Sequence, residues 1–188
     1  MRIISGTARG TKLYTLEGMN TRPTLDRVKE SVFNIIGEQI YGSTVLDLFS
    51  GSGAIGLEIA SRGAKKVYLC DLSKEACYII QKNIEKTKLQ EKVRLYQGDF
   101  LKLINKLNGK KVDIIYLDPP YETDFIVKSI TELLKNEIIL ESTLIIIETD
   151  REKEIIKQIE KLEVEIIDKR KYGRAYIIFL KKINLKGE

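Results

Sequence analysis

The chain has 188 residues, a formal net charge of +5, two cysteines and no histidine. This length fits one domain with its own core. Two cysteines without histidine indicate neither a disulfide framework nor a structural metal site. No apolar run is long enough to span a membrane, and the opening MRIISGTARG lacks the apolar centre of a secretion signal. We therefore expect one domain over residues 1–188, a monomeric cytoplasmic protein, with neither a membrane nor a metal as partner.

The first predicted elements lie before residue 37. Segments 2–4 and 12–14 flank a glycine-containing turn, which predicts a hairpin with Arg9 near its tip. Pro23 and Thr24 then begin a helix. Its apolar positions share one face at helical spacing: Leu25, Val28, Val32, Ile35 and Ile36.

Strands and helices then alternate to the end of the chain. The strands are predicted at 45–49, 66–70, 93–96, 112–117 and 142–148, and the helices at 54–62, 73–88, 100–107, 124–136 and 151–161. Two closing strands, 164–170 and 175–181, are joined too tightly to be parallel. The predicted fold class is α/β and Rossmann-like, with a mostly parallel seven-stranded sheet and an antiparallel last strand. Helices cover both faces, and the N-terminal β-hairpin is an addition.

The most informative motif runs from Asp118 to Tyr121, directly after the apolar run 112–117. It therefore lies at the carboxyl end of a strand, where open α/β sheets bind ligands. The Asp118 carboxylate and the Pro119 carbonyl can accept the two hydrogens of a planar amino group, and Tyr121 can stack on the attached ring. A simple turn after a strand is the alternative interpretation.

A second motif follows the strand 45–49. Gly51, Gly53 and Gly56 have the spacing of a loop that turns tightly into a helix and approaches a ligand closely. Binding sites for several adenosine-containing cofactors share this glycine spacing, so the spacing alone does not identify the cofactor. Asp71 follows the next strand and can accept hydrogen bonds from ribose hydroxyls, or it can cap a helix.

The third strand leads to Asp99 and Phe100. Asp99 can accept the adenine amino group, while Phe100 can pack on the ring. Capping of the helix that begins near Phe100 explains Asp99 equally well.

These residues carry a resemblance to a known family. The run LDLFSGSGAIGLEIASRGA, the acidic residue after the second strand, GDF and DPPY resemble S-adenosylmethionine-dependent methyltransferases of the Rossmann-like type. The opening MRIISGTARGTKL and the run RPTLDRVKESVFNII resemble the RsmD family, from Met1 to about Lys182. The resemblance implies methylation of the exocyclic N2 of a guanine in small-subunit ribosomal RNA. The last motif position is often Phe in relatives and is Tyr121 here.

Residues and resemblance together give three candidate sets. The catalytic set is Asp118, Pro119, Pro120 and Tyr121. The set that binds S-adenosylmethionine is Thr24, Asp47, Phe49, Gly51, Gly53, Asp71, Leu72, Asp99 and Phe100. The set that binds ribosomal RNA is Arg2, Arg9, Lys12, Arg22 and Arg27. Arg22 can face RNA or, as the RPT run does in relatives, the cofactor.

The distribution of charge agrees with an RNA partner. Residues 1–36 hold six basic and three acidic side chains, and residues 164–188 hold seven and three. The middle of the chain is therefore slightly acidic, which suits a sulfonium in the centre and a polyanion at the rim. A solvated lysine-rich surface is the alternative.

Other functions remain open on sequence alone. An amino-methyltransferase acting on adenine N6 or cytosine N4 would use the same loop, whereas glutamine methyltransferases usually have Asn in place of Asp118. An NAD-dependent oxidoreductase fits the glycine spacing but leaves the 118–121 loop unexplained. A non-catalytic RNA-binding module would not need Asp47, Asp71, Asp99 and Asp118 together. The modified nucleotide is not evident, nor is whether free RNA or a small ribosomal subunit is the substrate.

Overall fold

The computed structural model describes residues 1–16, 23–120 and 124–184, and in the first helix it describes side chains from Lys29 onward. The helices are α1 (Pro23–Ile40), α2 (Ala54–Ser61), α3 (Lys74–Thr87), α4 (Phe100–Lys106), α5 (Phe125–Lys135) and α6 (Glu152–Ile159). The strands are β1 (Thr44–Asp47), β2 (Lys66–Asp71), β3 (Val93–Gln97), β4 (Val112–Leu117), β5 (Ile139–Thr149), β6 (Val164–Tyr172) and β7 (Ala175–Lys182). Most predicted boundaries agree to within two residues, while β5 begins three residues earlier than the predicted 142.

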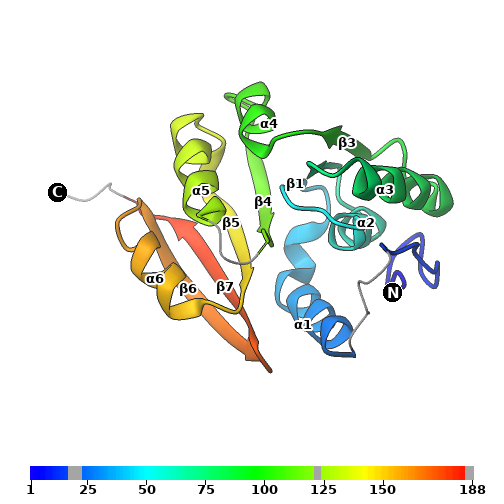
Figure 1. The fold of residues 1–188 in the computed structure, drawn as a ribbon, viewed down its shortest axis with the longest axis horizontal. Helices are drawn as coiled ribbons and strands as arrows, with labels where there is room; N and C mark the ends of the chain where they lie inside the picture. The colour runs from blue at the N-terminus through cyan, green and yellow to red at the C-terminus, as the bar shows by residue number, and fades with distance from the viewer. Residues whose placement is uncertain (17–22, 121–123, 185–188) are drawn as a thin grey trace.

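All seven strands form one sheet in the order β3-β2-β1-β4-β5-β7-β6 (Figure 1). Neighbours from β3 to β5 are parallel, and β7 is antiparallel to both β5 and β6. The predicted fold class is confirmed. The last strand of the chain is inserted between β5 and β6 rather than added at the edge.

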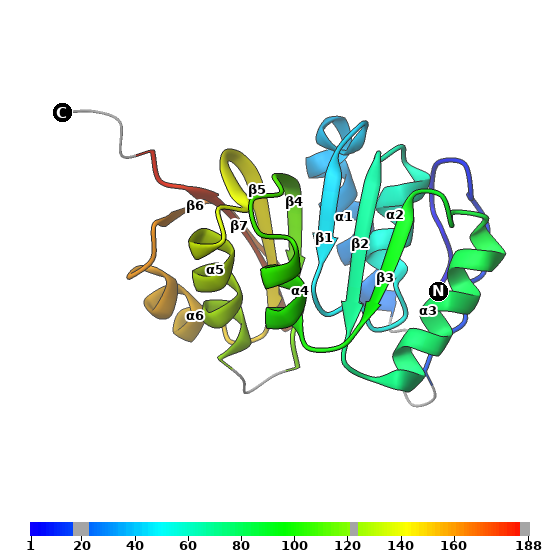
Figure 2. The ribbon, with the colours of Figure 1, turned by 90° about the horizontal axis from the view of Figure 1, so that it is seen from above.

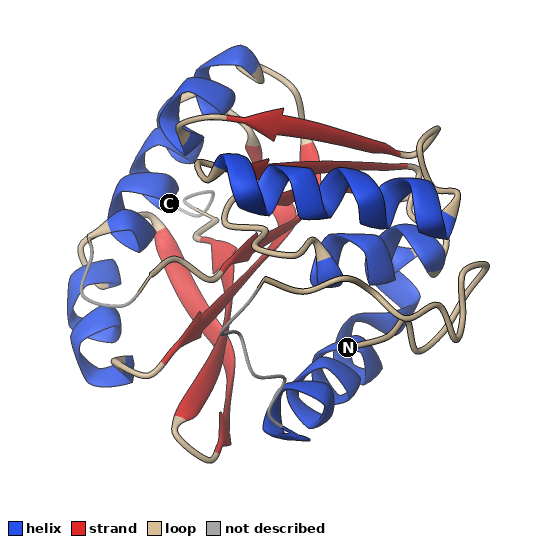
Figure 3. Cartoon of the chain, turned by 45° about the vertical axis from the view of Figure 1, so that its right-hand side comes forward, coloured by secondary structure: helices blue, strands red, loops and turns tan. Residues whose placement is uncertain are grey.

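Two apolar layers hold helices against the sheet. One packs α1, α2 and α3 on one face, and the other packs α4, α5 and α6 on the opposite face (Figures 1 and 3). Side chains alternate between the faces along each strand, so Val45, Ile114 and Ile146 face the first layer. No helix in the described part of the chain is long and apolar enough to cross a membrane.

The predicted apolar face of α1 is partly wrong. Val32 and Ile36 are buried as expected, but Ile35 is 40% exposed and Phe33 is buried instead. Phe33 lies one residue after Val32, so the buried stripe is wider than an i, i+3, i+4 pattern suggests.

The N-terminal segment forms the predicted hairpin, in a short form. Arg2 and Lys12 make an antiparallel bridge, and on either side of it the amide of Ile3 donates to the carbonyl of Thr11 and the amide of Leu13 to the carbonyl of Met1, both at 3.0 Å. The hairpin is fastened to the end of α2, because the amide of Thr7 donates to the carbonyl of Ser61 at 2.9 Å. Since α2 runs opposite to the strands, its last residues lie at the amino edge of the sheet. From there the segment runs along α3 (Figure 2), where Tyr14 exchanges hydrogen bonds with the buried side chain of Asn83.

The β6–β7 turn lies at the other edge. β6 is antiparallel to β7, which is antiparallel to β5, so β6 and β5 point the same way and end at the carboxyl edge. The hydroxyl groups of Tyr172, the last residue of β6, and Ser31 of α1 are hydrogen-bonded. This contact fixes the turn beside α1.

Candidate functional site at the carboxyl edge of the sheet

The glycine loop connects β1 to α2 in a conformation that its residues require. Gly51 and Gly53 have φ values of 55° and 77°, in the left-handed region that glycine adopts without strain. A side chain at Gly56 would place a Cβ 2.2 Å from Leu69 Cδ2. The first two glycines therefore shape the loop, and the third lets α2 pack closely on β2.

Asp71 joins this loop to the end of β2. Its Oδ2 accepts the amide of Gly51 at 2.8 Å, and its Oδ1 accepts the amide of Ser73 at 2.9 Å. The helix-cap alternative is wrong for this residue, because Ser73 caps α3 and accepts the amide of Ala76. A carboxylate has about four acceptor positions, so Asp71 can still accept ribose hydroxyls. Leu72 beside it is 72% exposed and offers an apolar surface at the rim.

Asp99 does cap a helix. Its Oδ1 accepts the amides of Leu101 and Lys102 at 2.9 and 3.2 Å, at the start of α4. Helix capping and acceptance of the adenine amino group are compatible roles for Asp99, because no group among the described residues donates to its Oδ2.

Phe100 belongs to an aromatic cluster. Its ring centroid lies 5.1 Å from that of Phe49 and 5.2 Å from that of Phe125. Phe100 is buried, whereas Phe49 and Phe125 are partly exposed. An aromatic wall thus connects β1, α4 and α5, and Phe125 is a member that the sequence did not indicate.

Asp47 lies under the glycine loop with an unusual environment. Its side chain is 2% exposed, and its Oδ1 has no hydrogen-bond donor among the described residues. Burial raises its pKa to about 7, although hydrogen bonds from Ser50 and the loop backbone oppose the shift. A buried carboxylate oxygen without a donor is a suitable acceptor for a cationic or hydrogen-bond-donating ligand.

Asp118 has a carboxyl neighbour that the sequence analysis missed. Leu117 of β4 pairs with Ile147 of β5, so Asp118 and Glu148 are the next residues on adjacent parallel strands. Glu148 is 8% exposed and accepts a hydrogen bond from the Tyr116 hydroxyl at 2.5 Å. Burial, followed by the charges of Glu148 and Asp47, raises the pKa of Asp118 well above its ordinary value.

These groups share one face of the sheet. Asp47, Tyr116, Asp118 and Glu148 have the same parity as Val45, Ile114 and Ile146, which pack against the α1 side. The signal available in the sequence was a glutamate at the carboxyl end of the apolar run LIIIE, but the order of strands was needed to place it beside Asp118.

The remaining predicted site residues lie away from the carboxyl edge or outside the part of the chain that the structure describes. Tyr121 and Arg22, and the side chains of Thr24 and Arg27, lie outside the described residues. The N-terminal basic residues Arg2, Arg9 and Lys12 are exposed. Arg9 follows the Gly6–Ala8 turn that binds the end of α2, so it lies at the amino edge, opposite Asp118.

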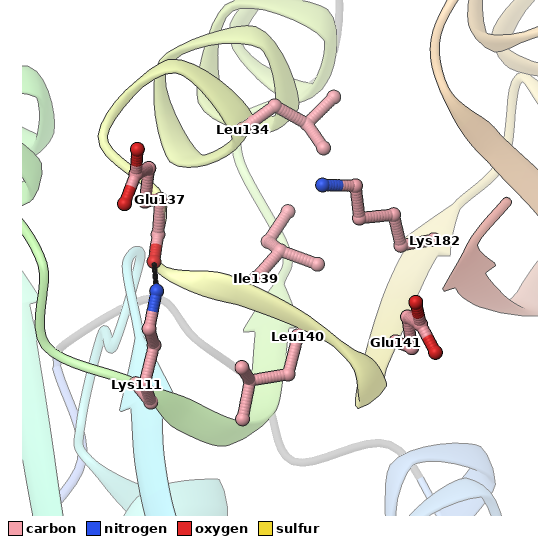
Figure 4. Close-up of a pocket in the computed structure, with 7 residues that line it drawn as sticks. All are labelled: Lys111, Leu134, Glu137, Ile139, Leu140, Glu141 and Lys182. Carbon is pink, nitrogen blue, oxygen red and sulfur yellow. Dashed lines mark hydrogen bonds between the residues drawn. The ribbon is translucent and has the colours of Figure 1, made fainter. Parts of the chain in front are cut away.

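A surface depression of about 320 Å³ is also at the amino edge. Its lining includes Lys111, just before β4, and Glu137, just before β5 (Figure 4). Lys111 Nζ donates to the Glu137 carbonyl at 2.6 Å. Because its lining lies at the amino ends of β4 and β5, the depression is separate from the carboxyl-edge residues. Over the described ranges, no cluster of three or more acidic or cysteine side chains could hold a metal ion.

The sheet order, the inserted antiparallel β7 and the loops at the carboxyl edge define a Rossmann-like methyltransferase. The chain belongs to the family described as Conserved hypothetical protein 95, whose model matches residues 1–181. It is 38% identical over 160 residues to ribosomal RNA small subunit methyltransferase D of Haemophilus influenzae, covering 83% of this chain and 82% of that protein. The predicted membership of the RsmD family is thereby confirmed.

Solved structures agree with this assignment. A Haemophilus influenzae protein of known structure superposes with a TM-score of 0.78 and 28% identity, covering 97% of this chain and 98% of that one. The structure of SMU.776, complexed with SAH, superposes with a TM-score of 0.68 and 23% identity, covering 82% of this chain and 48% of that one. The second likeness concerns the fold alone.

Proposed function

We propose that this protein transfers a methyl group from S-adenosylmethionine to the exocyclic N2 of a guanine in small-subunit ribosomal RNA. The observation that carries the proposal is the position of Asp118, partly buried beside Glu148 at the end of β4 and next to the glycine loop. Membership of the RsmD family supports the substrate class, because a relative is named for small-subunit ribosomal RNA. The choice of guanine N2 rests on that family.

The residues at the carboxyl edge fit the methyl donor. Asp47 Oδ1 is a buried acceptor that receives no hydrogen bond from the described residues, and it is suited to the amino group of the methionine part. Asp71 suits the ribose hydroxyls, and Leu72 with the Phe49 wall suits the adenine ring. The bound donor supplies an electrophilic methyl group on a sulfonium, and the surrounding carboxylates favour that positive charge.

The 118–121 loop acts on the nucleophile. The N2 lone pair is delocalised into the guanine ring, so the amino group must leave the ring plane to attack. Asp118 accepts one N2 hydrogen, and the Pro119 carbonyl accepts the other as the nitrogen becomes tetrahedral. The new N–C bond forms as the methyl–sulfur bond breaks, with that electron pair remaining on sulfur. N2 then loses one proton to the Asp118 carboxylate.

The test of the function is direct. The protein is incubated with methyl-labelled donor and unmodified small-subunit RNA, both free and in assembled subunits, and the labelled nucleoside is identified after digestion. N2-methylguanosine is the expected product. Label in N6-methyladenosine or N4-methylcytidine would move the chain to another amino-methyltransferase class, and no label in either substrate would contradict the proposal.

Asp71→Ala should weaken the binding of S-adenosylmethionine by about 1–3 kcal/mol, because ribose hydroxyls lose an acceptor in a partly dry site. Removing the carboxylate also frees the Gly51 amide, which loosens the loop. Titration calorimetry of the free protein measures this loss. Asp113→Ala, at the amino end of β4, serves as the control; equal affinities for parent and Asp71→Ala would reject the assignment.

The RNA contacts are proposed on both edges. Arg2, Arg9 and Lys12 are exposed on the N-terminal segment, with Arg9 at the amino edge. Lys171, near the end of β6, and Arg174, in the β6–β7 turn, are exposed at the carboxyl edge. Lys171 Nζ lies 5.3 Å from the Tyr176 ring. RNA that delivers a guanine to Asp118 must cross the carboxyl edge, so the turn is better placed than the N-terminal segment for contacts near the target base.

Arg174→Ala should weaken RNA binding and lower the salt slope of log K by up to about one, the effect of losing one phosphate contact. Arg9→Ala is the paired variant and should show the same slope change only if the RNA reaches the amino edge. Filter binding of a fragment containing the target, measured over a series of salt concentrations, separates the two. Parental slopes in both variants would assign these side chains to an ordinary solvated surface.

A further inference from the structure

The side chain of Glu148 has no part in the reaction as described above, yet it is buried and hydrogen-bonded beside the reacting group. It is 8% exposed on a central strand, and its Oε2 receives the Tyr116 hydroxyl at 2.5 Å. Tyr116 is itself 2% exposed. A buried carboxylate is costly unless it is paired, and no cation forms an ion pair with Glu148 in the described part of the chain.

The carboxyl group of Asp118 raises the electrostatic cost of a charged Glu148 further. Asp118 is the adjacent residue across the β4–β5 pair, on the same face, and Asp47 of β1 lies on the far side of β4 on that face. Three carboxyl groups therefore end three adjacent strands. The groups that face Glu148 are Asp118 and Tyr116 from β4 and the apolar Ile177 paired with it from β7. From α1, the buried Lys29 lies one turn before Val32 and Phe33 in the layer that covers this face.

We propose that Glu148 is a positioning residue whose charge, fixed by Tyr116, makes Asp118 a stronger proton acceptor for the guanine amino group. The inference rests on the proposed function. The Tyr116 hydroxyl donates to Glu148 and so favours its ionised form, and when the two carboxyl groups share one proton, Asp118 holds it. The same hydrogen bond lowers the pKa of Glu148, against the increase that burial causes. Asp118, without such a donor among the described residues, has its pKa raised well above its ordinary value.

The consequence for the reaction follows from the direction of the shift. Asp118 must be ionised to accept the proton that N2 releases, and a base is most effective when its pKa is near the working pH. Glu148 brings Asp118 toward that condition. Turnover should therefore rise with pH up to the pKa of Asp118 and be lost as the pH falls through it. The pair titrates together, so the observed value belongs to both groups.

Glu148→Gln tests the role of the charge while keeping an acceptor for Tyr116. Methylation rates are measured against pH, with cofactor and RNA both saturating. We expect the acid limb of the variant to move to lower pH by about one unit or more, since a neighbouring negative charge is removed. The turnover number on the plateau should fall as Asp118 becomes a weaker base. Glu141→Gln, at the amino end of the same strand, should keep the parental profile.

A second measurement does not depend on activity. Carboxyl carbon NMR of the cofactor-free protein, labelled in aspartate, follows the titration of Asp118 directly; Asp118→Asn identifies its signal. In Glu148→Gln the Asp118 signal should titrate at lower pH, and in Tyr116→Phe it should move the same way by less. The free energy of unfolding above neutral pH should be unchanged or higher, because a repulsive buried charge is gone.

A purely structural role for Glu148 gives different results. It predicts lower folding stability in Glu148→Gln with an unchanged acid limb and an unchanged Asp118 titration, and that outcome would overturn the inference. If the parent protein methylates no ribosomal RNA, the proposed function fails. The NMR titration would still decide whether the two carboxyl groups are coupled.

Discussion

Replacing Asp118 with alanine is expected to lower the turnover number by about 10²–10³-fold, the range seen when one preorganised polar group is removed from an active site. The loss should appear in the rate at saturating cofactor, because Asp118 acts mainly as N2 becomes tetrahedral. Cofactor affinity should stay close to parental, since Asp71 and the glycine loop carry that binding. Asp118→Asn should lose less than Asp118→Ala, because its amide oxygen still accepts a hydrogen bond, but its rate should lack the acid limb, because an amide cannot take the proton that N2 releases.

The matched control for this substitution lies just beyond the loop. Asp124 is exposed and forms a surface ion pair with Lys128 at 2.8 Å, so Asp124→Ala should change turnover little. Initial rates of methyl transfer for both variants decide the matter. A turnover number for Asp118→Ala within about threefold of the parent, a small part of the expected loss, would remove Asp118 from the reaction.

Tyr121 completes the same prediction. Stacking needs a ring and no hydroxyl, so Tyr121→Phe should remain active, while Tyr121→Ala should lose roughly 1–3 kcal/mol of base positioning. If both variants were equally inactive, the hydroxyl would take part in the chemistry and the stacking role would be wrong.

The elements of the fold were predictable because local signals agree with one another. Glycine loops, apolar strand runs and helix caps each follow from a few neighbouring residues, and the strict alternation of strand and helix leaves few topologies open. The same locality explains Asp99, whose capping role depends only on the next three residues. The antiparallel pairing of β6 and β7 follows from their short connection, whereas the insertion of β7 between β5 and β6 depends on tertiary packing.

The missed residues depend on distant neighbours. Glu148 is thirty positions from Asp118, and only the β4–β5 register brings them together. Phe125 closes the aromatic cluster because α5 begins beside α4. The position of Arg9 was equally hidden, since its distance from the catalytic loop is set by where the N-terminal segment docks. Sequence patterns identify which residues have suitable chemistry, whereas tertiary contacts decide which of them meet.

Among the side chains that dock this segment, Glu58 of α2 accepts two of its backbone amides. Glu58 is fully buried, and its two oxygens accept the amides of Ile4 and Ser5 at 2.7 and 2.9 Å. Oε1 also accepts Arg62 Nε at 2.8 Å, and the Arg62 guanidinium lies 4.6 Å from the Phe33 ring centroid. One carboxylate thus joins the N-terminal segment to α2 and, through Arg62, to α1.

Glu58→Ala should therefore lower the free energy of unfolding by about 3–5 kcal/mol, the cost of leaving a buried charge and its donors without a partner. Urea unfolding measures the loss. Glu85→Ala, which removes an exposed side chain of α3 that accepts a hydrogen bond from Gln81, should stay within about 0.5 kcal/mol of the parent. If the segment detaches instead, the free-energy loss will be smaller, but hydrogen exchange at the Ile4 and Ser5 amides will rise sharply. A small loss together with protected amides would show that Glu58 does not anchor the segment. Other contacts would then have to hold the N-terminal segment, and with it Arg9, in place.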